Sequence, residues 1–347
     1  MKKRIKLVFL IVFVLLLCIR SADAKNYAVL ISAGETYEDD AAVNSEYWYD
    51  MFLMYKTLID EGYSHEDIYV LYGNGSDFES IHECYQNSYP VTDFPNYESN
   101  IESIFSFLGS IMTEDDFLFV WWMGHGDRLW VSGGWHLSLY IENINVWIWD
   151  FELVSHINQI QNYRIRTFSF MTCFSGGIID DLEGFKSIVF TATDFCPDCL
   201  ASSDWLCDSW HAELNYYEAC AFHWETPCNL CGGVDADIYQ NSMISFEEAY
   251  LYSDSHMMWS DPQKSDQGSL APNTYLAQSC FPTGDANSDG VIDIGDVIYL
   301  LNYLFIDGPP PDPLVAGDVT CDEEVNIGDV IYLLSYLFSG GPPPGCC

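Results

Sequence analysis

Phe117-Leu-Phe-Val-Trp-Trp-Met-Gly-His-Gly126 is the part of the sequence that says most about its fold. Its seven leading apolar residues are too few for an ordinary helix and predict a strand buried on both faces. Similar apolar runs occupy 27–32, 68–72, 167–171 and 188–192, and amphipathic stretches with helical spacing occupy 45–61, 97–112 and 150–161. Strands that alternate with helices predict an α/β domain with a mainly parallel central sheet, over residues 25–258.

Two reactive side chains follow predicted strands closely. His125 comes just after the strand 117–123, and Cys173 comes just after the strand 167–171. In open α/β sheets, ligands bind outside the carboxyl ends of the strands. If these two strands are neighbours, the imidazole and the thiol will meet at one rim of the sheet.

This pair of residue types suits nucleophilic catalysis, although either residue alone is more often structural. A free thiol is mostly protonated at neutral pH, and a nearby imidazole can take its proton and stabilise the thiolate that attacks a carbonyl. Gly126 and the small residues after Cys173, namely Ser175, Gly176 and Gly177, would leave room for a substrate backbone. The backbone N–H groups of Gly126 and Cys173 are candidates for an oxyanion hole.

The same residues carry a resemblance to a known family. An apolar strand that ends in His-Gly and a second that ends in Cys resemble the caspase-like cysteine peptidases, and among these legumain. The likeness covers residues 27–217 and includes the predicted helix and strand of 55–71. It implies a caspase-like fold, a peptide or protein substrate, His125 as the general base and Cys173 as the nucleophile. It implies no cofactor for catalysis.

Two positions depart from legumain. The arginine that recognises an asparagine side chain at P1 falls at Glu46, and the acidic residue two positions before the nucleophile is Met171. A carboxylate attracts a guanidinium or ammonium group, so we expect Glu46 to bind substrate, with Asp194 after the strand 188–192 as a second contact. Alternatively, Glu46 is a solvated residue at a helix start, where a carboxylate favours the helix dipole.

The C-terminal part contains an internal repeat. Residues 294–305 read IGDVIYLLNYLF, and 327–338 repeat them with one change, from Asn302 to Ser335. An acidic loop precedes each copy. In the first loop, oxygen ligands fall at the EF-hand positions 1, 3, 5, 7, 9 and 12, the seventh through a backbone carbonyl: Asp285, Asn287, Asp289, Val291, Asp293 and Asp296. The sequence therefore predicts bound Ca²⁺.

The second loop is a poorer match to the same pattern. Its ligands would be Asp318, Thr320, Asp322, Glu324, Asn326 and Asp329. Thr320 replaces the preferred carboxylate or amide at position 3, and Glu323 stands where the sharp turn prefers glycine. We expect weaker calcium binding here; the alternative for either loop is an acidic surface loop without metal.

Two loop-helix units without a helix before each loop resemble a type I dockerin, over residues 284–341. The resemblance implies a small all-α module that uses structural Ca²⁺ and docks to a cohesin module on a scaffold or surface protein. The nearly identical helices would allow a partner to bind in two orientations. The Cys-containing residues 342–347 form a tail. Residues 259–283, which are polar and contain three prolines, are interpreted as a linker or a wrapped tail.

The N-terminus has the order of a secretory signal peptide over residues 1–24. A basic start precedes an apolar run at 7–19 and then Ala22-Asp-Ala24. Cleavage there removes five of the 12 basic and one of the 52 acidic side chains, which leaves 7 and 51. We expect a secreted or cell-surface protein that repels nucleic acid, and no segment long enough to span a membrane.

Twelve cysteines remain after residue 24, which in an exported chain predicts disulfides. If Cys173 is free, the other eleven cannot all pair within the chain. The Cys-x-x-Cys pairs at 196–199 and 228–231 could instead form a zinc knuckle, but disulfides are favoured because their separation exceeds the usual zinc-ribbon spacing. The histidines at 211, 223 and 256 are interpreted as surface or packing residues.

Three hypotheses from different classes follow. The first is a secreted cysteine endopeptidase that works through a thioester acyl-enzyme and is tethered by the calcium-dependent repeats. The second is a transpeptidase or transamidase that uses the same pair of residues, since hydrolysis and transfer differ only in whether water or an amine reaches the acyl-enzyme. The third is a catalytically silent binding protein.

Overall fold

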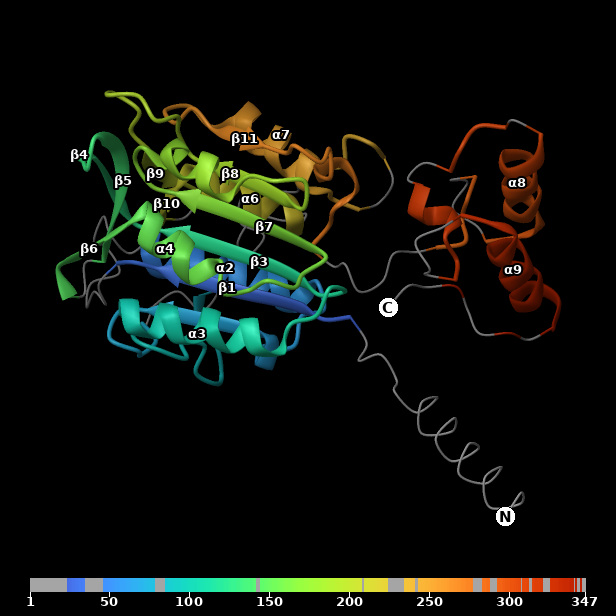
Figure 1. Cartoon of the computed structure of the whole chain (residues 1–347), viewed down its shortest axis with the longest axis horizontal. Coiled ribbons are helices and arrows are strands. Elements are labelled where there is room, and N and C mark those ends of the chain that lie inside the picture. The colour runs from blue at the N-terminus through green and yellow to red at the C-terminus, as the bar shows by residue number, and fades with distance from the viewer. Residues whose placement is uncertain are drawn as a thin grey trace, which may run out of the picture.

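The computed structural model describes residues 24–34, 46–78, 85–141, 144–207, 209–223, 234–240, 243–276, 283–287, 292–306, 308–311, 314–320, 325–339, 341 and 344. Within them, a six-stranded sheet has the order β11-β8-β7-β3-β1-β2 (Figure 1). Its parallel strands are β1 (Asn26–Ser32), β2 (Ile68–Tyr72), β3 (Phe117–Met123), β7 (Ile165–Met171) and β8 (Ser187–Thr191). Only β11 (Gln263–Ser265) is antiparallel.

Helices cover both faces of this sheet, which explains the continuous apolar runs of the strands. Neighbouring residues of β1 enter different cores. Leu30 packs in the core formed with α2 (Glu46–Asp60), α6 (Glu213–His223) and α7 (Phe246–His256). Ile31 packs in the core formed with α3 (Glu98–Ile111) and α4 (Asp150–Ile157). The prediction of a mainly parallel sheet flanked by helices is confirmed.

Two small antiparallel sheets stand beside the main sheet and were not expected from the sequence. One contains β4 (His125–Val131), β5 (Gly134–Ile141) and β6 (Val146–Trp149), and the other pairs β9 (Ser203–Leu206) with β10 (Ser209–Ala212). Short helical segments complete the unit: η2 (His65–Asp67), η5 (Ser175–Ile178), α5 (Ile179–Leu182) and η7 (Ala271–Asn273). Both small sheets contribute residues to the site described below.

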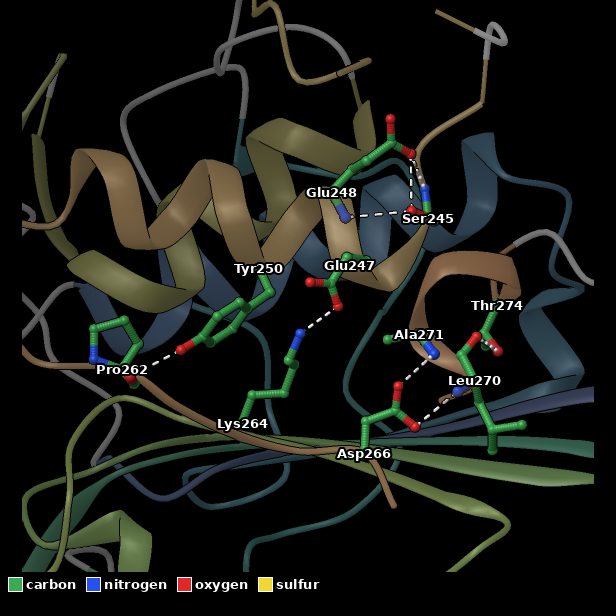
Figure 2. A network of polar contacts seen from close by, with 10 residues as sticks. All are labelled: Ser245, Glu247, Glu248, Tyr250, Pro262, Lys264, Asp266, Leu270, Ala271 and Thr274. Carbon is green, nitrogen blue, oxygen red and sulfur yellow. Dashed lines mark hydrogen bonds and ion pairs between the residues drawn. The ribbon is translucent and has the colours of Figure 1, made fainter. Parts of the chain in front are cut away.

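The predicted linker at 259–283 packs on the α/β unit as far as residue 276. β11 adds to the edge of the sheet through pairs such as Lys264↔Phe190. Figure 2 shows how α7 fixes this segment: Lys264 forms an ion pair with Glu247, and the Tyr250 hydroxyl donates to the carbonyl of Pro262 at 3.0 Å. These contacts use polar side chains and backbone groups, so the apolar pattern gave no signal of them. The segment is a wrapped tail, the other interpretation that the sequence allowed.

The C-terminal module has a hydrophobic core of its own. α8 (Ile294–Phe305) and α9 (Ile327–Ser339) pack together with η8 (Leu314–Gly317) nearby. Val297 and Leu300 of α8 meet Val330 and Leu333 of α9, and all four are almost fully buried. Equivalent residues of the two repeats thus form one shared core, as the repeat predicts.

Three further expectations bear on the chain as a whole. No helix in the described part of the chain is long and apolar enough to cross a membrane. The predicted signal peptide lies almost entirely outside the described residues. Cys196 and Cys199 form a disulfide, as favoured over zinc for this pair, whereas Cys228 and Cys231 lie outside the described residues.

Candidate functional site

The register of two neighbouring strands brings the predicted dyad to one rim. β3 pairs with β7 in parallel so that Met123 lies opposite Met171, and the N–H of Gly124 donates to the carbonyl of Met171 at 3.1 Å. His125 and Cys173 therefore leave the sheet side by side. Between β1 and β3 the chain changes its direction of travel across the sheet, which is where ligand crevices form in open α/β sheets.

Gly126 lies against the backbone of the nucleophile candidate. A Cβ at Gly126 would come within 2.3 Å of both the carbonyl oxygen of Cys173 and Oγ1 of Thr172. No real Cβ approaches backbone so closely, so this position requires glycine for packing. Its role is to let strand β4 pass directly over the Cys173 segment.

A cavity of about 90 Å³ opens at this rim. It brings together three of the sequence-predicted site residues, Glu46, His125 and Cys173, which come from α2, β4 and the end of β7. Its other lining residues are Tyr47, Met123, Gly124, Met171, Thr172, Ala201, Ser203 and Ala212. Ala201, Ser203 and Ala212 belong to the β9–β10 region, which sequence reasoning did not connect with the site.

Cys173 is half-buried, and its thiol lies 3.8 Å from the carbonyl oxygen of Ala201, which can accept its hydrogen. Burial raises the pKa of the Cys173 thiol, an effect that the hydrogen bond to Ala201 opposes and the negative charge of Asp127 reinforces. The resting residue is therefore a thiol and not a preformed thiolate. A base is needed to remove its proton before it can act as a nucleophile.

His125 is exposed at the start of β4, and one of its neighbours is the buried Tyr47. The two rings meet edge to face with their centres 6.0 Å apart. The carbonyl of Tyr47 accepts a hydrogen bond of 2.7 Å from Oγ of Ser32, at the end of β1. The first turn of α2 is thus fastened to the sheet rim, with Tyr47 against the imidazole and Glu46 in the cavity.

Glu46 is not the solvated helix-start residue that the alternative interpretation described, because only 6% of it is exposed. Its Oε1 accepts from the hydroxyl of Ser203 at 3.3 Å, whereas Oε2 is buried and has no hydrogen-bond partner among the described residues. Burial raises the pKa of Glu46 to about 7. A hydrogen bond from its own backbone N–H opposes the rise, and the negative charge of Asp50 adds to it. The Glu218 carboxyl has an unsatisfied oxygen too, but Glu218 does not line this cavity, whereas Glu46 does.

A buried polar network lies one helical turn beyond Glu46. Nδ1 of His211 lies 2.5 Å from Oδ1 of Asp50, and Nε2 of His211 lies 3.3 Å from the Tyr85 hydroxyl. The N–H of Ala212 donates to the second Asp50 oxygen at 2.8 Å. His211 is therefore a buried residue that joins β10 to α2, and not a surface residue. Its partner is 161 positions away in the sequence, so no local pattern reveals the pairing.

The small residues after Cys173 do not provide space for a substrate. Ser175 is buried and its N–H donates to the hydroxyl of Thr193 at 3.2 Å. A Cβ at Gly176 would lie 2.9 Å from the backbone of Asp194, and one at Gly177 would lie 2.6 Å from the ring of Phe195. They make room for the segment that follows β8. Asp194 itself is exposed and does not line the cavity.

The disulfide loop forms part of the wall beside the nucleophile. The N–H of Phe174 donates to the carbonyl of Cys199 at 2.9 Å, and Cys199 is bonded to Cys196. Phe174 has a φ of 60°, in the left-handed region that costs a non-glycine residue energy. Strain of this kind next to a candidate nucleophile is typical of functional sites, where the surrounding structure holds an unfavourable backbone in place.

The two acidic loops of the C-terminal module have matching internal contacts. At position 12, the fully buried Asp296 accepts from the N–H groups of Asn287 and Asp293 at 3.2 and 2.8 Å. Asp329 accepts in the same way from Thr320 and Asn326 at 2.9 and 2.8 Å. Each loop is therefore closed around its last carboxylate.

The described parts of both loops keep oxygen-bearing side chains at EF-hand positions, a donor set that suits a hard cation such as Ca²⁺. The predicted ligands inside the described residues are Asp285, Asn287, Asp293, Asp296, Asp318, Thr320, Asn326 and Asp329. Asp289, Val291, Asp322 and Glu324 lie outside them. Within the described residues no three His, Cys, Asp or Glu side chains converge on a metal-sized site.

Comparison with known protein families identifies this module. The model of the dockerin type I domain matches residues 283–338. These residues form a dockerin type I domain. Calcium binding is a property of such dockerin domains, so the structural role predicted for Ca²⁺ is supported.

Comparisons for the whole chain add little to this. No curated protein sequence matches it significantly. Among solved structures, a crystal structure of a Geobacter sulfurreducens protein from a structural genomics programme matches with a TM-score of 0.45 and 9% identity. That match covers 70% of this chain and 92% of the other.

The dockerin domain exposes one apolar set on each helix. Ile298 and Phe305 of α8 are 53% and 67% exposed, and their counterparts on α9, Ile331 and Phe338, are 60% and 69% exposed. The apolar side chains of α8 thus fall into two groups: Val297 and Leu300 are buried, whereas Ile298 and Phe305 are exposed. Equivalent exposure on both helices means that the dockerin domain presents nearly the same apolar surface twice.

Proposed function

We propose that the α/β unit is a cysteine endopeptidase that hydrolyses peptide bonds through His125 and Cys173. The observation that carries this proposal is the shared cavity, because a thiol, an imidazole and a buried carboxylate from three separate elements line one small opening. The opening lies at the carboxyl ends of parallel strands, next to the change of direction between β1 and β3. The resemblance of these strands to legumain and other caspase-like peptidases supports the same reaction.

In the proposed reaction, His125 removes the proton from the Cys173 thiol, and the sulfur attacks the carbonyl carbon of the peptide. The amine leaves with a proton from His125, and a thioester joins the acyl part of the substrate to Cys173. Water, deprotonated by His125, then releases the acid and restores the thiol. The raised pKa of Cys173 makes this base indispensable at neutral pH. N–H groups of Gly126 and Cys173 remain the candidates for stabilising the oxyanion.

The dockerin domain would tether this activity to a larger assembly. A dockerin domain implies a cohesin partner, and calcium-dependent docking is the function that its family supports. The exposed apolar residues repeated on α8 and α9 are the surfaces that we propose for this contact. We also propose that the protein is secreted, since such domains typically belong to extracellular or cell-surface proteins.

Two other functions use the same features. A transpeptidase would pass the acyl group from Cys173 to an amine instead of water. A catalytically silent protein would use only the dockerin domain. The catalytically silent protein is disfavoured because His125 and Cys173 line the same cavity.

A peptide carrying a thiol-reactive electrophile in place of the scissile bond tests the proposal. We expect one molecule to attach to the full-length protein, at Cys173, as seen by intact-mass and peptide mass spectrometry. His125→Ala should slow this labelling strongly, while labelling by a small non-peptide alkylating agent changes much less. Labelling of Cys173 at equal rates by both reagents would indicate an exposed thiol without a substrate site. Adding a nucleophilic amine during peptide turnover distinguishes transfer from hydrolysis.

A further inference from the structure

Glu46 presents an unsatisfied buried oxygen to the cavity that contains Cys173. Only 6% of the residue is exposed, and its Oε2 has no hydrogen-bond partner in the part of the chain that the structure describes. A buried acceptor without a hydrogen bond destabilises a protein, and the cost is larger when the group is charged. Because Glu46 lines the cavity, a ligand that enters the cavity could supply the missing donor.

The described residues place no lysine or arginine beside this carboxylate. None of the described residues that line the cavity is either of these. His211, the basic side chain behind Glu46, is already engaged by Asp50 at 2.5 Å. Ser203 contributes one neutral hydrogen bond to Oε1 at 3.3 Å. Among the described residues, Glu46 therefore feels the charge of His211 but has no lysine or arginine as an ion-pair partner in the cavity.

We infer that Glu46 binds the basic side chain, Arg or Lys, of the substrate residue whose carbonyl is attacked by Cys173. The inference rests on the proposed peptidase function and names its substrate class. A guanidinium or ammonium group would donate to Oε2 and neutralise a carboxylate that water cannot fully solvate. Because the carboxylate and the thiol line the same cavity, a side chain held by Glu46 belongs to a residue next to the attacked bond.

A neutral or acidic substrate side chain would bind a different protonation state of Glu46 than a basic one. The pH dependence of substrate binding therefore distinguishes a basic substrate from the others. With a pKa of about 7, Glu46 exists in both forms near neutral pH. A substrate with a cationic side chain binds the ionised form of Glu46, so the KM of this substrate falls as the pH rises through 7. A substrate whose amide or carboxyl side chain accepts a hydrogen bond binds the protonated form of Glu46, so the KM of this substrate rises over the same pH range. The groups facing Glu46 that could also respond to pH are Asp50 from α2, His211 from β10, and His125 and Cys173 in the cavity.

The test uses peptides that differ only at the residue before the scissile bond, with Arg, Lys, citrulline, Asn and Asp compared. Citrulline has nearly the shape of arginine without its charge. The full-length protein should cleave the Arg peptide with a kcat/KM at least about 30-fold above that of the citrulline peptide, the size expected for a buried charge pair. The preference should lie mostly in KM and increase from pH 6 to pH 8.

Two variants locate the effect. In Glu46→Gln, the ratio of Arg to citrulline cleavage should collapse to within a few-fold of one, and its rise with pH should disappear. Glu102→Gln makes the same change at an exposed residue of α3 outside the cavity, and the ratio should persist. If Glu46→Gln does not fold, the ratio and its pH dependence in the unmodified protein still decide the matter.

The outcomes distinguish this inference from the function on which it rests. Cleavage that favours Asn, Asp or citrulline over Arg and Lys overturns the role of Glu46 and leaves the peptidase standing. A preference for Arg that persists in Glu46→Gln also overturns the role of Glu46 and leaves the peptidase standing. If no peptide is cleaved and Cys173 is not labelled by any peptide electrophile, the peptidase and the inference both fail.

Discussion

A Cβ placed on Gly126 would lie 2.3 Å from the carbonyl oxygen of Cys173. Strand β4, which begins with His125, therefore passes in direct contact with the backbone that carries the thiol. Two segments separated by 48 positions in the sequence are thus held in a fixed relation at the rim of the sheet. The proposed dyad depends on this contact as much as on the identity of its two side chains.

We predict that Gly126→Ala lowers peptidase kcat/KM by at least about 10-fold, because the added methyl group must push the His125 strand away from Cys173. Gly134→Ala in β5 is the matched control, since the nearest atom to its new Cβ lies at an ordinary 3.4 Å. Steady-state kinetics of both variants, with circular dichroism to check folding, measures the difference. An equal fall of kcat/KM in the two variants would show that the contact between Gly126 and the Cys173 backbone does not position the dyad.

The disulfide loop should affect the reactivity of Cys173. Cys199 accepts the hydrogen bond from Phe174, and Ala201 accepts from the thiol, so both contacts depend on the order of residues 196–201. We predict that the double variant Cys196→Ser and Cys199→Ser remains folded but is labelled more slowly at Cys173 by the peptide electrophile. A labelling rate identical to that of the unmodified protein would show that the loop does not position the nucleophile.

Glu218 should make the stability of the protein fall as pH rises. It is fully buried, it accepts from Oγ of Ser169 at 2.6 Å, and burial raises its pKa to about 8, compared with an ordinary value of 4.5. The folded protein therefore keeps this proton when the unfolded chain has lost it. The resulting stabilisation is complete below pH 4.5 and is lost as the pH rises to about 8.

We predict that Glu218→Gln flattens this decline, since the amide cannot ionise and can still accept from Ser169. Urea unfolding at pH 5 and at pH 8 measures the change, which should be on the order of a few kcal/mol smaller in the variant. Glu102→Gln, which removes an exposed carboxylate from α3, is the control and should keep the original slope. If the free energy of unfolding falls just as much between pH 5 and pH 8 in Glu218→Gln, groups other than Glu218 cause the pH dependence.

The first calcium loop should bind more tightly than the second. Asp285→Ala should remove more calcium affinity than Asp318→Ala, because the first loop has Asn287 at position 3 and Gly290 at the turn. Isothermal titration of the full chain compares the two variants at the same loop position. Cleavage of a small peptide should persist without calcium in both, since the proposed dyad lies outside the dockerin domain. Tighter calcium binding by the second loop than by the first would contradict the prediction that the first loop has the better ligands.

The strands of the main sheet could be predicted because each carries an uninterrupted apolar run. β2 and β3 begin and end where the sequence indicates, and β1, β7 and β8 differ by one or two residues. β11 could not be predicted, since its three residues, Gln263–Ser265, are polar and gain their place from pairing with β8. The hairpin β9–β10 has no strong alternation either, and its position beside the cavity is a tertiary effect.

The site could be predicted where a reactive residue directly follows an apolar strand. It could not be predicted where a residue's role depends on a contact that is distant in the sequence. His125 and Cys173 follow apolar strands, so a common rim could be inferred. The burial of His211 depends on Asp50, which is remote in sequence, and the roles of Gly176 and Gly177 depend on the segment after β8. Glycine spacing alone does not tell whether the free space serves a substrate or another part of the chain.

Mass spectrometry of peptide products shows whether His125 and Cys173 hydrolyse peptide bonds. The unmodified protein, Cys173→Ala and His125→Ala are each incubated with a mixed peptide library, and new peptide ends are identified. We predict cleavage by the unmodified protein, none by Cys173→Ala, and a rate lowered by several orders of magnitude in His125→Ala, with all three equally folded. Cleavage by Cys173→Ala at the rate of the unmodified protein would contradict the account.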